Sequence, residues 1–214
     1  MLVVAPETGM CSHFAVADRL TEPEQAAISS LSRSQEARRQ RVIEAAIELA
    51  TEGGYDAVQM RDVAMRARVA MGTIYRYFTS KDHLLSAAQV EWALTLQRRV
   101  TQRPHPDAPT ADRVVQVLRR ATRAMERQPR LTAAFVTAAS STDPAVSERQ
   151  REVASIVEST IGYALGDDDV GDSAGIIRVL GYVWQGALVV WLNGQNTAAQ
   201  MSDELERAAR LLLR

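Results

Sequence analysis

Two short helical segments joined by a tight turn constrain the fold of this 214-residue chain more than any other feature. Apolar residues recur at helical spacing within residues 58–67 and again within residues 70–78. Two short helices around such a turn form a helix-turn-helix. The small side chains of Ala64 and Ala67 allow the close approach of the two helices. The sequence therefore predicts a helix-turn-helix between residues 58 and 78.

The second of these helices divides into an inward face and an open face. Val69, Ile74 and Phe78 are spaced so that they can hold the helix against a core. The open face, with Tyr75 at its edge, then consists of Gly72, Thr73, Arg76 and Tyr77.

Composition favours an all-α protein. Aromatic residues make up 5% of the chain, and seven prolines and eleven glycines are few for its length, which disfavours many short strands. The single cysteine, Cys11, excludes an internal disulfide framework and a zinc site built from cysteines. No apolar run reaches the roughly 18–20 residues that span a bilayer, and a secretory signal pattern is missing from the N-terminus. We therefore expect a soluble, cytoplasmic, helical protein that does not associate with membranes.

Helical periodicity also outlines the rest of the chain. Residues 1–32 have no sustained period, and we expect them to form a flexible N-terminal arm. Ser34 can cap a helix that ends at Gly53 and Gly54, and this helix completes a three-helix domain with the motif, over residues 33–80. Residues 81–214 form a second helical domain with predicted helices at 81–103, 110–127, 129–140, 143–165, 173–194 and 200–213.

Charge is distributed unevenly along the chain. The formal net charge is −1, but residues 31–103 carry twelve basic and eight acidic side chains, whereas the segments on either side are net acidic. A basic segment within an acidic chain indicates a local surface for a polyanion such as DNA.

The sequence offers no arrangement typical of an enzyme. None of its three histidines, His13, His83 and His105, neighbours a plausible catalytic partner, and no glycine-rich phosphate loop occurs. The carboxylates of residues 167–169 could bind a cation, but three consecutive aspartates in a loop are more typical of a solvated surface. We therefore predict no enzymatic activity, no cofactor and no metal site.

The segment around the motif resembles the DNA-binding domain of TetR-family transcriptional regulators. The resemblance covers about residues 36–85 and rests on Gly54–Ala57, Arg61–Ala64, Ala67, Gly72–Phe78 and Lys81–Leu84. Within that family, the residues 59–61 and 75–78 are similar to KstR-type regulators of sterol catabolism. Many family members have Thr or Ser in place of Gln59, and both cap a helix better than glutamine does. Many also have Gly in place of Arg68. Arg68 either adopts a left-handed conformation, at a cost of about 1–2 kcal/mol, or the turn differs slightly.

The resemblance implies which residues contact operator DNA. The second motif helix would read the major groove, and Lys81, at the start of the next helix, would anchor a phosphate. A plain packing role for the tyrosines and a solvated role for Lys81 and the arginines are the alternatives. The candidate DNA-binding residues are Arg38, Arg39, Gln59, Arg61, Gly72, Thr73, Tyr75, Arg76, Tyr77 and Lys81.

The resemblance also makes residues 81–214 a ligand-binding and dimerisation domain. Alanines beside aromatic residues can leave room for an apolar ligand between helices, although ordinary core packing explains most of them individually. The candidate ligand-binding residues are Trp92, Leu96, Met125, Phe135 and Trp184. The last two helices would pair with those of a second copy through Ile176, Leu180, Val183, Ala187, Leu205, Ala208, Ala209 and Leu212.

Together these features predict a homodimeric transcriptional repressor. A hydrophobic small molecule, such as a lipid, a sterol derivative or an acyl-CoA, would bind the second domain, shift the helix at 81–103 and release the operator. The alternatives are an activator, a regulator without a small effector, or a small-molecule-binding protein whose DNA reader has decayed.

Overall fold

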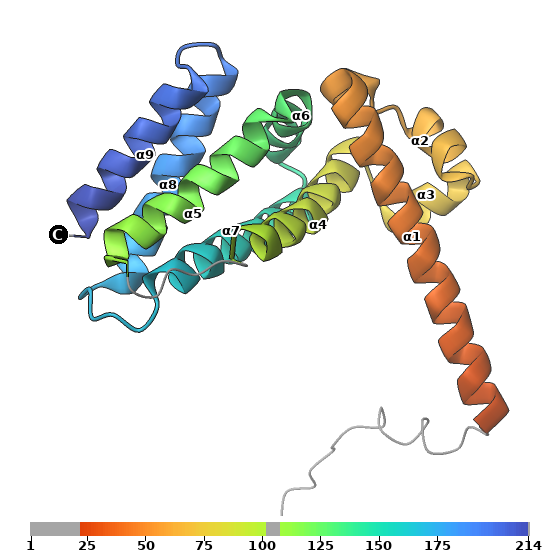
Figure 1. Cartoon of the computed structure of the whole chain (residues 1–214). Coiled ribbons are helices and arrows are strands. Elements are labelled where there is room, and N and C mark those ends of the chain that lie inside the picture. The colour runs from red at the N-terminus through yellow and green to blue at the C-terminus, as the bar shows by residue number, and fades with distance from the viewer. Residues whose placement is uncertain (1–21, 102–107, 214) are drawn as a thin grey trace, which may run out of the picture. The chain divides into compact units, whose positions relative to one another are not determined.

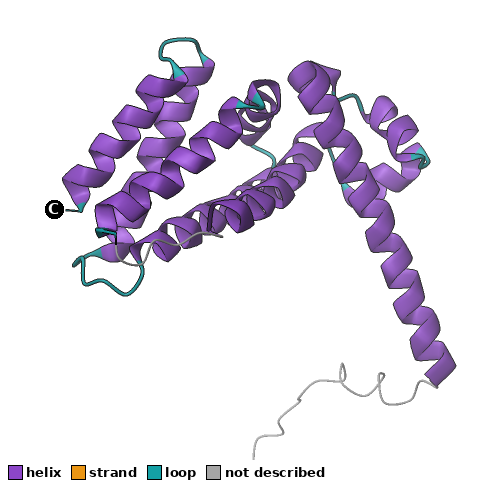
Figure 2. Ribbon diagram, in the orientation of Figure 1, coloured by secondary structure: helices purple, strands orange, loops and turns teal. Residues whose placement is uncertain are grey.

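The structure is a computed structural model that describes residues 22–101 and 108–213, with side chains described from residue 33 onward. Within those residues it is entirely helical, which confirms the predicted all-α class (Figures 1 and 2). The described residues fall into two units, of which the first ends at Arg39 and the second begins at Gln40. The helices are α1 (Glu22–Ala57), α2 (Met60–Ala67), α3 (Met71–Tyr77), α4 (Lys81–Thr101), α5 (Thr110–Glu126), α6 (Pro129–Ala139), α7 (Pro144–Leu165), α8 (Ser173–Leu192) and α9 (Ala198–Leu212).

Helix α1 begins earlier than the sequence analysis predicts. It starts at Glu22, so residues 22–32 are helical and not part of an irregular arm, while residues 1–21, including His13 and Cys11, lie outside the described residues. Pro23 stands at the second position of the helix, where a missing backbone N–H costs nothing. The predicted start of this helix relied on an apolar stripe, and such a stripe is expected only where a helix packs on a core.

The other end of α1 follows the prediction closely. Gly54 has φ 73° and ψ −162°, a conformation that interrupts the helix and that glycine adopts without strain. One further turn then extends to Ala57 and leads into α2. This kink lies in the second unit, where it positions the residues that later contact α4.

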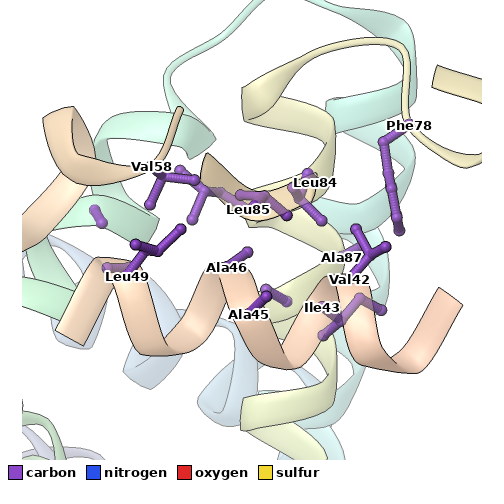
Figure 3. Packing of buried hydrophobic residues seen from close by; sticks show 14 of the residues in the cluster. Val42, Ile43, Ala45, Ala46, Leu49, Val58, Phe78, Leu84, Leu85 and Ala87 are labelled. Atoms are coloured by element: carbon purple, nitrogen blue, oxygen red, sulfur yellow. The ribbon is translucent and has the colours of Figure 1, made fainter. Parts of the chain in front are cut away.

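A core of small and aliphatic side chains holds the C-terminal part of α1 to α2, α3, α4 and α6. Ile43, Ile74 and Leu85 are fully buried in it, and the predicted packing residue Phe78 is 2% exposed. Figure 3 shows the side chains of α1 meeting those of α4, with Phe78 at one end and Val58 toward the other. Ala64 and Ala67 are buried on α2, as the close approach of α2 requires.

A second core lies between α4, α5, α7, α8 and α9. Its centre consists of Leu118, Ile161, Leu180 and Met201, each at most 1% exposed. Helix α9 packs against both α5 and α8. Its start is fixed by a capping box, in which Thr197 and Gln200 each bond the other's backbone N–H.

Helix α8 corrects one prediction of the sequence analysis. Over Ser173–Leu192 it is long and apolar enough to cross a membrane by length and composition, with a mean hydropathy of 1.5, although only 17% of that stretch is buried. Arg178 interrupts the apolar run, but it is the only charged residue of this helix.

Candidate nucleic-acid interface and ligand cavity

The turn between α2 and α3 contains a residue in the left-handed conformation, which was one of the two alternatives given for Arg68. Arg68 has φ 55° and ψ 50°. The backbone N–H of Val69 donates to the carbonyl of Ala64 at 3.0 Å, which closes the end of α2. The tight turn is therefore preserved with arginine in the position that usually favours glycine, and the strain is accepted within the motif.

The N-terminus of α2 lacks a side-chain cap, as expected from its residue. Gln59 occupies the cap position, but its side chain instead donates to the carbonyl of Asp56 at 2.8 Å. Glu52 and Glu48 on α1 hold the other end of α2 through Arg66, whose guanidinium lies 2.6 Å from Glu52 Oε1. This pairing lowers the pKa of Glu52 below its ordinary value.

Helix α3 presents the open face that the sequence predicts, with one change. Tyr75 is 54% exposed, and Gly72 and Arg76 are exposed as well. Tyr77 is half-buried and packs against the core, with its ring 6.3 Å from that of Phe78. The two tyrosines therefore exchange the places given to them: Tyr75 is the more outward residue, and Tyr77 lies at the edge.

Gly72 has no packing reason to be glycine. A Cβ atom built at this position meets nothing within 4 Å, and the residue lies inside α3 with no positive φ. Glycine weakens a helix relative to alanine, and packing within the described residues does not explain its presence here.

Lys81 is engaged inside the protein. Its ammonium group donates to the carbonyl of Tyr55 at 3.2 Å and lies 3.6 Å from the centre of the Tyr55 ring. The hydroxyl of Tyr55 donates to Asp82 Oδ1 at 2.6 Å, and this bond, with burial and the nearby carboxylates, raises the pKa of Tyr55 to about 12. These contacts fasten the end of α1 to the start of α4, which sequence reasoning did not anticipate for Lys81.

The remaining candidate DNA residues lie on α1 and α2. Arg61 on α2 is 82% exposed, with Asp62 3.8 Å away. Arg38 and Arg39 belong to the first unit, where Arg39 pairs with Glu36 at 3.1 Å. Arg41, in the second unit, donates to the carbonyl of Ala67 at 3.4 Å and so joins α1 to α2.

A cavity of about 460 Å³ lies between α4, α5, α6, α7 and α8. This volume falls within the range of small-molecule sites. Met125 and Trp184 line it, as the sequence analysis expects of ligand-binding residues. The other lining residues are Gln89, Val136, Ala139, Ser140, Gln150, Val153, Ala154, Val157, Glu158, Ile177, Arg178, Gly181, Tyr182, Gln185, Leu188 and Val189.

The other three candidate ligand residues do not line this cavity. Trp92 donates its indole N–H to Gln128 Oε1 at 3.1 Å, and its ring packs at a tilt of 59°, 6.0 Å from that of Phe135, against the core around α1. Leu96 is buried in the second core. These three residues pack in the cores of the protein. Helical periodicity could not reveal this, because it identifies buried faces but does not distinguish a packed face from one that borders a cavity.

Helix α7 supplies residues that sequence reasoning missed. Gln150, Val153, Ala154, Val157 and Glu158 all line the cavity. No sequence motif identifies them, because an ordinary surface helix has the same mixture of polar and aliphatic residues. The neighbouring indole N–H of Trp184 is buried without a hydrogen-bond partner among the described residues.

Four predicted dimer residues belong to the core of the single chain. Leu180, Ala187, Leu205 and Ala209 are at most 6% exposed in the single chain, so they offer little surface to a partner, and their place in an interface stays a prediction. The other four, Ile176, Val183, Ala208 and Leu212, are half-buried against the same core. Both faces of α8 carry hydrophobic side chains, and the predicted residues of α8 lie on its buried and half-buried face.

The outward face of α8 carries a different apolar stripe. Val179 is 42% exposed, Tyr182 68% and Val189 40%, and the spacing of these residues places them on one side of the helix together with the exposed Gly186. A Cβ built at Gly186 meets nothing within 4 Å, so this stripe is open. Among the described residues, no group of three or more His, Cys, Asp or Glu side chains is placed to hold a metal ion.

An exposed helix-turn-helix next to a helical bundle with an internal cavity defines a one-component DNA-binding regulator. Two family models match the chain: bacterial regulatory proteins of the tetR family over residues 42–88, and the tetracyclin repressor-like C-terminal domain over residues 108–212. The chain belongs to the TetR family. It is a TetR-type, DNA-binding transcriptional repressor and not an enzyme.

Individual relatives agree with this assignment. The chain is 37% identical over 183 residues to the HTH-type transcriptional repressor KstR of Rhodococcus jostii, covering 85% of each protein. A crystal structure of a TetR transcriptional regulator from Rhodococcus sp. RHA1 matches with a TM-score of 0.72 and 34% identity, over 84% of this chain and 97% of that one. The structure of FadR from Bacillus subtilis in complex with stearoyl-CoA shares the fold at 18% identity and a TM-score of 0.58, over 81% and 97%.

Proposed function

We propose that this protein is a homodimeric repressor that a hydrophobic small molecule releases from its operator. The observation that carries the proposal is the cavity of about 460 Å³ in the same compact unit as the exposed face of α3. Its lining is largely aliphatic, with Met125, Val157 and Leu188 among the contributors. A relative named KstR and a FadR structure that holds stearoyl-CoA support a lipid, a sterol derivative or an acyl-CoA as the effector class. A cytoplasmic location fits a protein that must reach DNA.

A chain of contacts leads from the cavity to the DNA-binding domain. Ser140 lines the cavity, and Asp143, three residues later, caps α7 by accepting from the N–H of Ala145 at 2.9 Å. The other carboxylate oxygen of Asp143 accepts from Thr79 and Ser80 at 3.4 Å each. Ser80 in turn caps α4, because its hydroxyl accepts from the N–H of His83 at 3.1 Å. A ligand that displaces the end of α6 therefore acts on the junction between α3 and α4.

Release requires that the effector bind better to the conformation that cannot hold DNA. Coupling of this kind typically amounts to about 1–3 kcal/mol, which weakens operator binding roughly 5- to 150-fold. In a dimer the two α3 helices must fit successive major grooves. A small change at the α3–α4 junction would therefore alter the fit of α3 at both half-sites.

The open stripe on α8 is the surface that we assign to the second copy. Tyr182 is its most exposed side chain, and Arg178 is the only charged residue of the same helix. A two-fold axis would bring the stripe against itself and cover apolar surface that water otherwise meets. Tyr182 and Val189 also line the cavity mouth, so the partner would lie close to the ligand.

The dimer is tested by Tyr182→Asp, which places a charge in the stripe. We expect this variant to sediment as a monomer at micromolar concentration and to lose specific operator binding, since a buried unpaired charge is strongly unfavourable. Tyr163→Asp is the matched control, because Tyr163 is 49% exposed on α7 and lies off the stripe. A dimeric Tyr182→Asp protein would place the interface elsewhere.

The function itself is tested by a mobility shift with purified protein and the DNA immediately upstream of its own gene. The proposal predicts a retained complex at dimer stoichiometry that weakens steeply as salt rises. Stearoyl-CoA, oleate and a sterol ketone are then added separately, and at least one should release the DNA. If selection from random DNA also yields no specific complex, the decayed-reader alternative replaces this proposal; if a complex forms but none of the probes releases it, a regulator without such an effector does.

A further inference from the structure

The cavity wall combines a large aliphatic area with very few charges. Of its lining residues only Glu158 and Arg178 are ionisable at neutral pH, and both are exposed to solvent, which places them at the mouth. The half-buried polar residues of the wall are neutral, and two of them, Gln89 on α4 and Gln150 on α7, touch each other. The ionisable side chains of the lining are therefore exposed, whereas its two half-buried polar side chains are uncharged.

The two glutamines form an amide pair with unused capacity. Gln150 Nε2 donates to Gln89 Oε1 at 2.9 Å, and the buried hydroxyl of Ser86 lies 3.5 Å from the same nitrogen. Within the described part of the chain, no other hydrogen bond involves the Gln89 amino group or the Gln150 oxygen. One amide NH2 group and one amide oxygen therefore remain available, and exchanging O and N in both amides leaves the same two kinds of group.

We propose that this Gln89–Gln150 pair is a specificity element that recognises one uncharged oxygen on an otherwise apolar effector. A ketone oxygen would accept from the free amide N–H, and a hydroxyl could also donate to the free amide oxygen. A carboxylate or an ammonium group would lose its hydration at the pair without meeting an opposite charge, so ionised groups belong at the mouth. This inference rests on the proposed function, since it concerns the ligand of the same cavity.

The pair makes a hydrocarbon and its oxygenated counterpart distinguishable. A polar pair that faces a plain hydrocarbon is desolvated without gaining a partner, whereas a ketone restores a hydrogen bond. Fluorene and 9-fluorenone are rigid tricycles of nearly the same shape that differ in this one oxygen. We expect the wild-type protein to bind 9-fluorenone about 3- to 10-fold more tightly than fluorene.

The experiment is equilibrium dialysis of the full chain against each tricycle, without DNA. Gln89→Met, Gln150→Met and the double variant keep the side-chain length and remove the hydrogen-bonding groups. We expect the double variant to bind fluorene at least as tightly as wild type and to lose the preference for 9-fluorenone. Gln185→Met is the matched control, because Gln185 also lines the cavity but is exposed on α8, and it should keep the preference.

Retained binding of fluorene shows that a variant is folded, so a change in preference is not a loss of structure. Equal affinity of the wild type for the two tricycles, no binding of either, tighter binding of fluorene-9-carboxylate, or a preference that survives in the double variant would each overturn the proposal. Because DNA is absent, these results are independent of operator binding. A protein that discriminates the tricycles but fails the mobility shift would contradict the proposed function and leave this inference standing.

Discussion

The two cores of this molecule are built differently, although both are all-helical and similar in composition. The core around α1, α2 and α3 is closed by fully buried side chains such as Ile43 and Ile74. The bundle from α4 to α9 instead encloses a cavity of about 460 Å³ and leaves an apolar stripe on α8 exposed. The first arrangement holds a reading helix in one position, whereas the second leaves space that a ligand and a partner can fill. The tightly packed core and the core with unfilled space thus lie in different parts of the chain.

We expect the largest effect, a loss in the free energy of unfolding, when the same substitution is made in each of the two cores. Ile74→Ala removes a fully buried side chain, and we expect the free energy of unfolding to fall by about 2–5 kcal/mol. Ile177→Ala, at a half-buried residue that borders the cavity, should cost roughly half as much or less, because part of that side chain already faces a void. Urea denaturation of both variants measures the difference. Equal losses would mean that the two regions are packed alike.

The next prediction concerns the reading helix. Arg76→Ala should weaken operator binding by about 1–3 kcal/mol per half-site, while the melting temperature stays unchanged, because the side chain is exposed on α3. Arg123→Ala is the matched control: it removes an equal charge from an exposed position on α5. Fluorescence anisotropy with labelled upstream DNA gives both affinities. A similar loss in the two variants would indicate general charge attraction and not readout by α3.

A smaller effect is expected where the two regions are joined. Tyr55→Phe removes the hydrogen bond to Asp82, and we expect a loss of about 0.5–1.5 kcal/mol in the free energy of unfolding. The pKa of Tyr55 is raised to about 12 from an ordinary value of 10.0, so the folded state holds this proton more tightly than the unfolded state. The stabilisation is therefore complete below pH 10 and is lost as the pH rises from 10 to 12.

This pH dependence gives the Tyr55 prediction its own control. Urea denaturation of wild type at pH 9 and at pH 11.5 should show a drop in stability that Tyr55→Phe reduces. An unchanged drop in the variant would show that other groups cause it, and that the contact between α1 and α4 contributes little.

Much of the fold could be predicted from the sequence, because its helices obey local rules. Proline after Gln128 and Asp143, glycine at Gly54 and the hydroxyl of Ser80 mark helix ends to within a few residues. The start of α1 could not be predicted in this way, since residues 22–32 carry no apolar stripe. Local signals describe each helix well and say little about what surrounds it.

The site was only partly predictable, for the same reason. The exposed positions of Gly72 and Arg76 on α3 follow from helical spacing, whereas spacing placed Tyr77 on the open face and Tyr75 at its edge, the reverse of what the structure shows. The cavity depends on how five helices pack, and its polar pair joins residues 61 positions apart in the sequence. Lys81 shows the limit most clearly: its type suggests a phosphate contact, but its neighbour in space is Tyr55.

The central claim is that occupation of the cavity controls DNA binding by α3. Gly181 lines the cavity within α8, and a Cβ built there meets nothing within 4 Å, so Gly181→Leu should fill the space without disturbing the backbone. The measurement is a mobility shift of wild type and Gly181→Leu on upstream DNA, titrated with whichever probe releases the wild type. The account predicts equal DNA affinity without the probe, and a variant that stays bound at probe concentrations that release the wild type. Release of both proteins at the same concentration would contradict it.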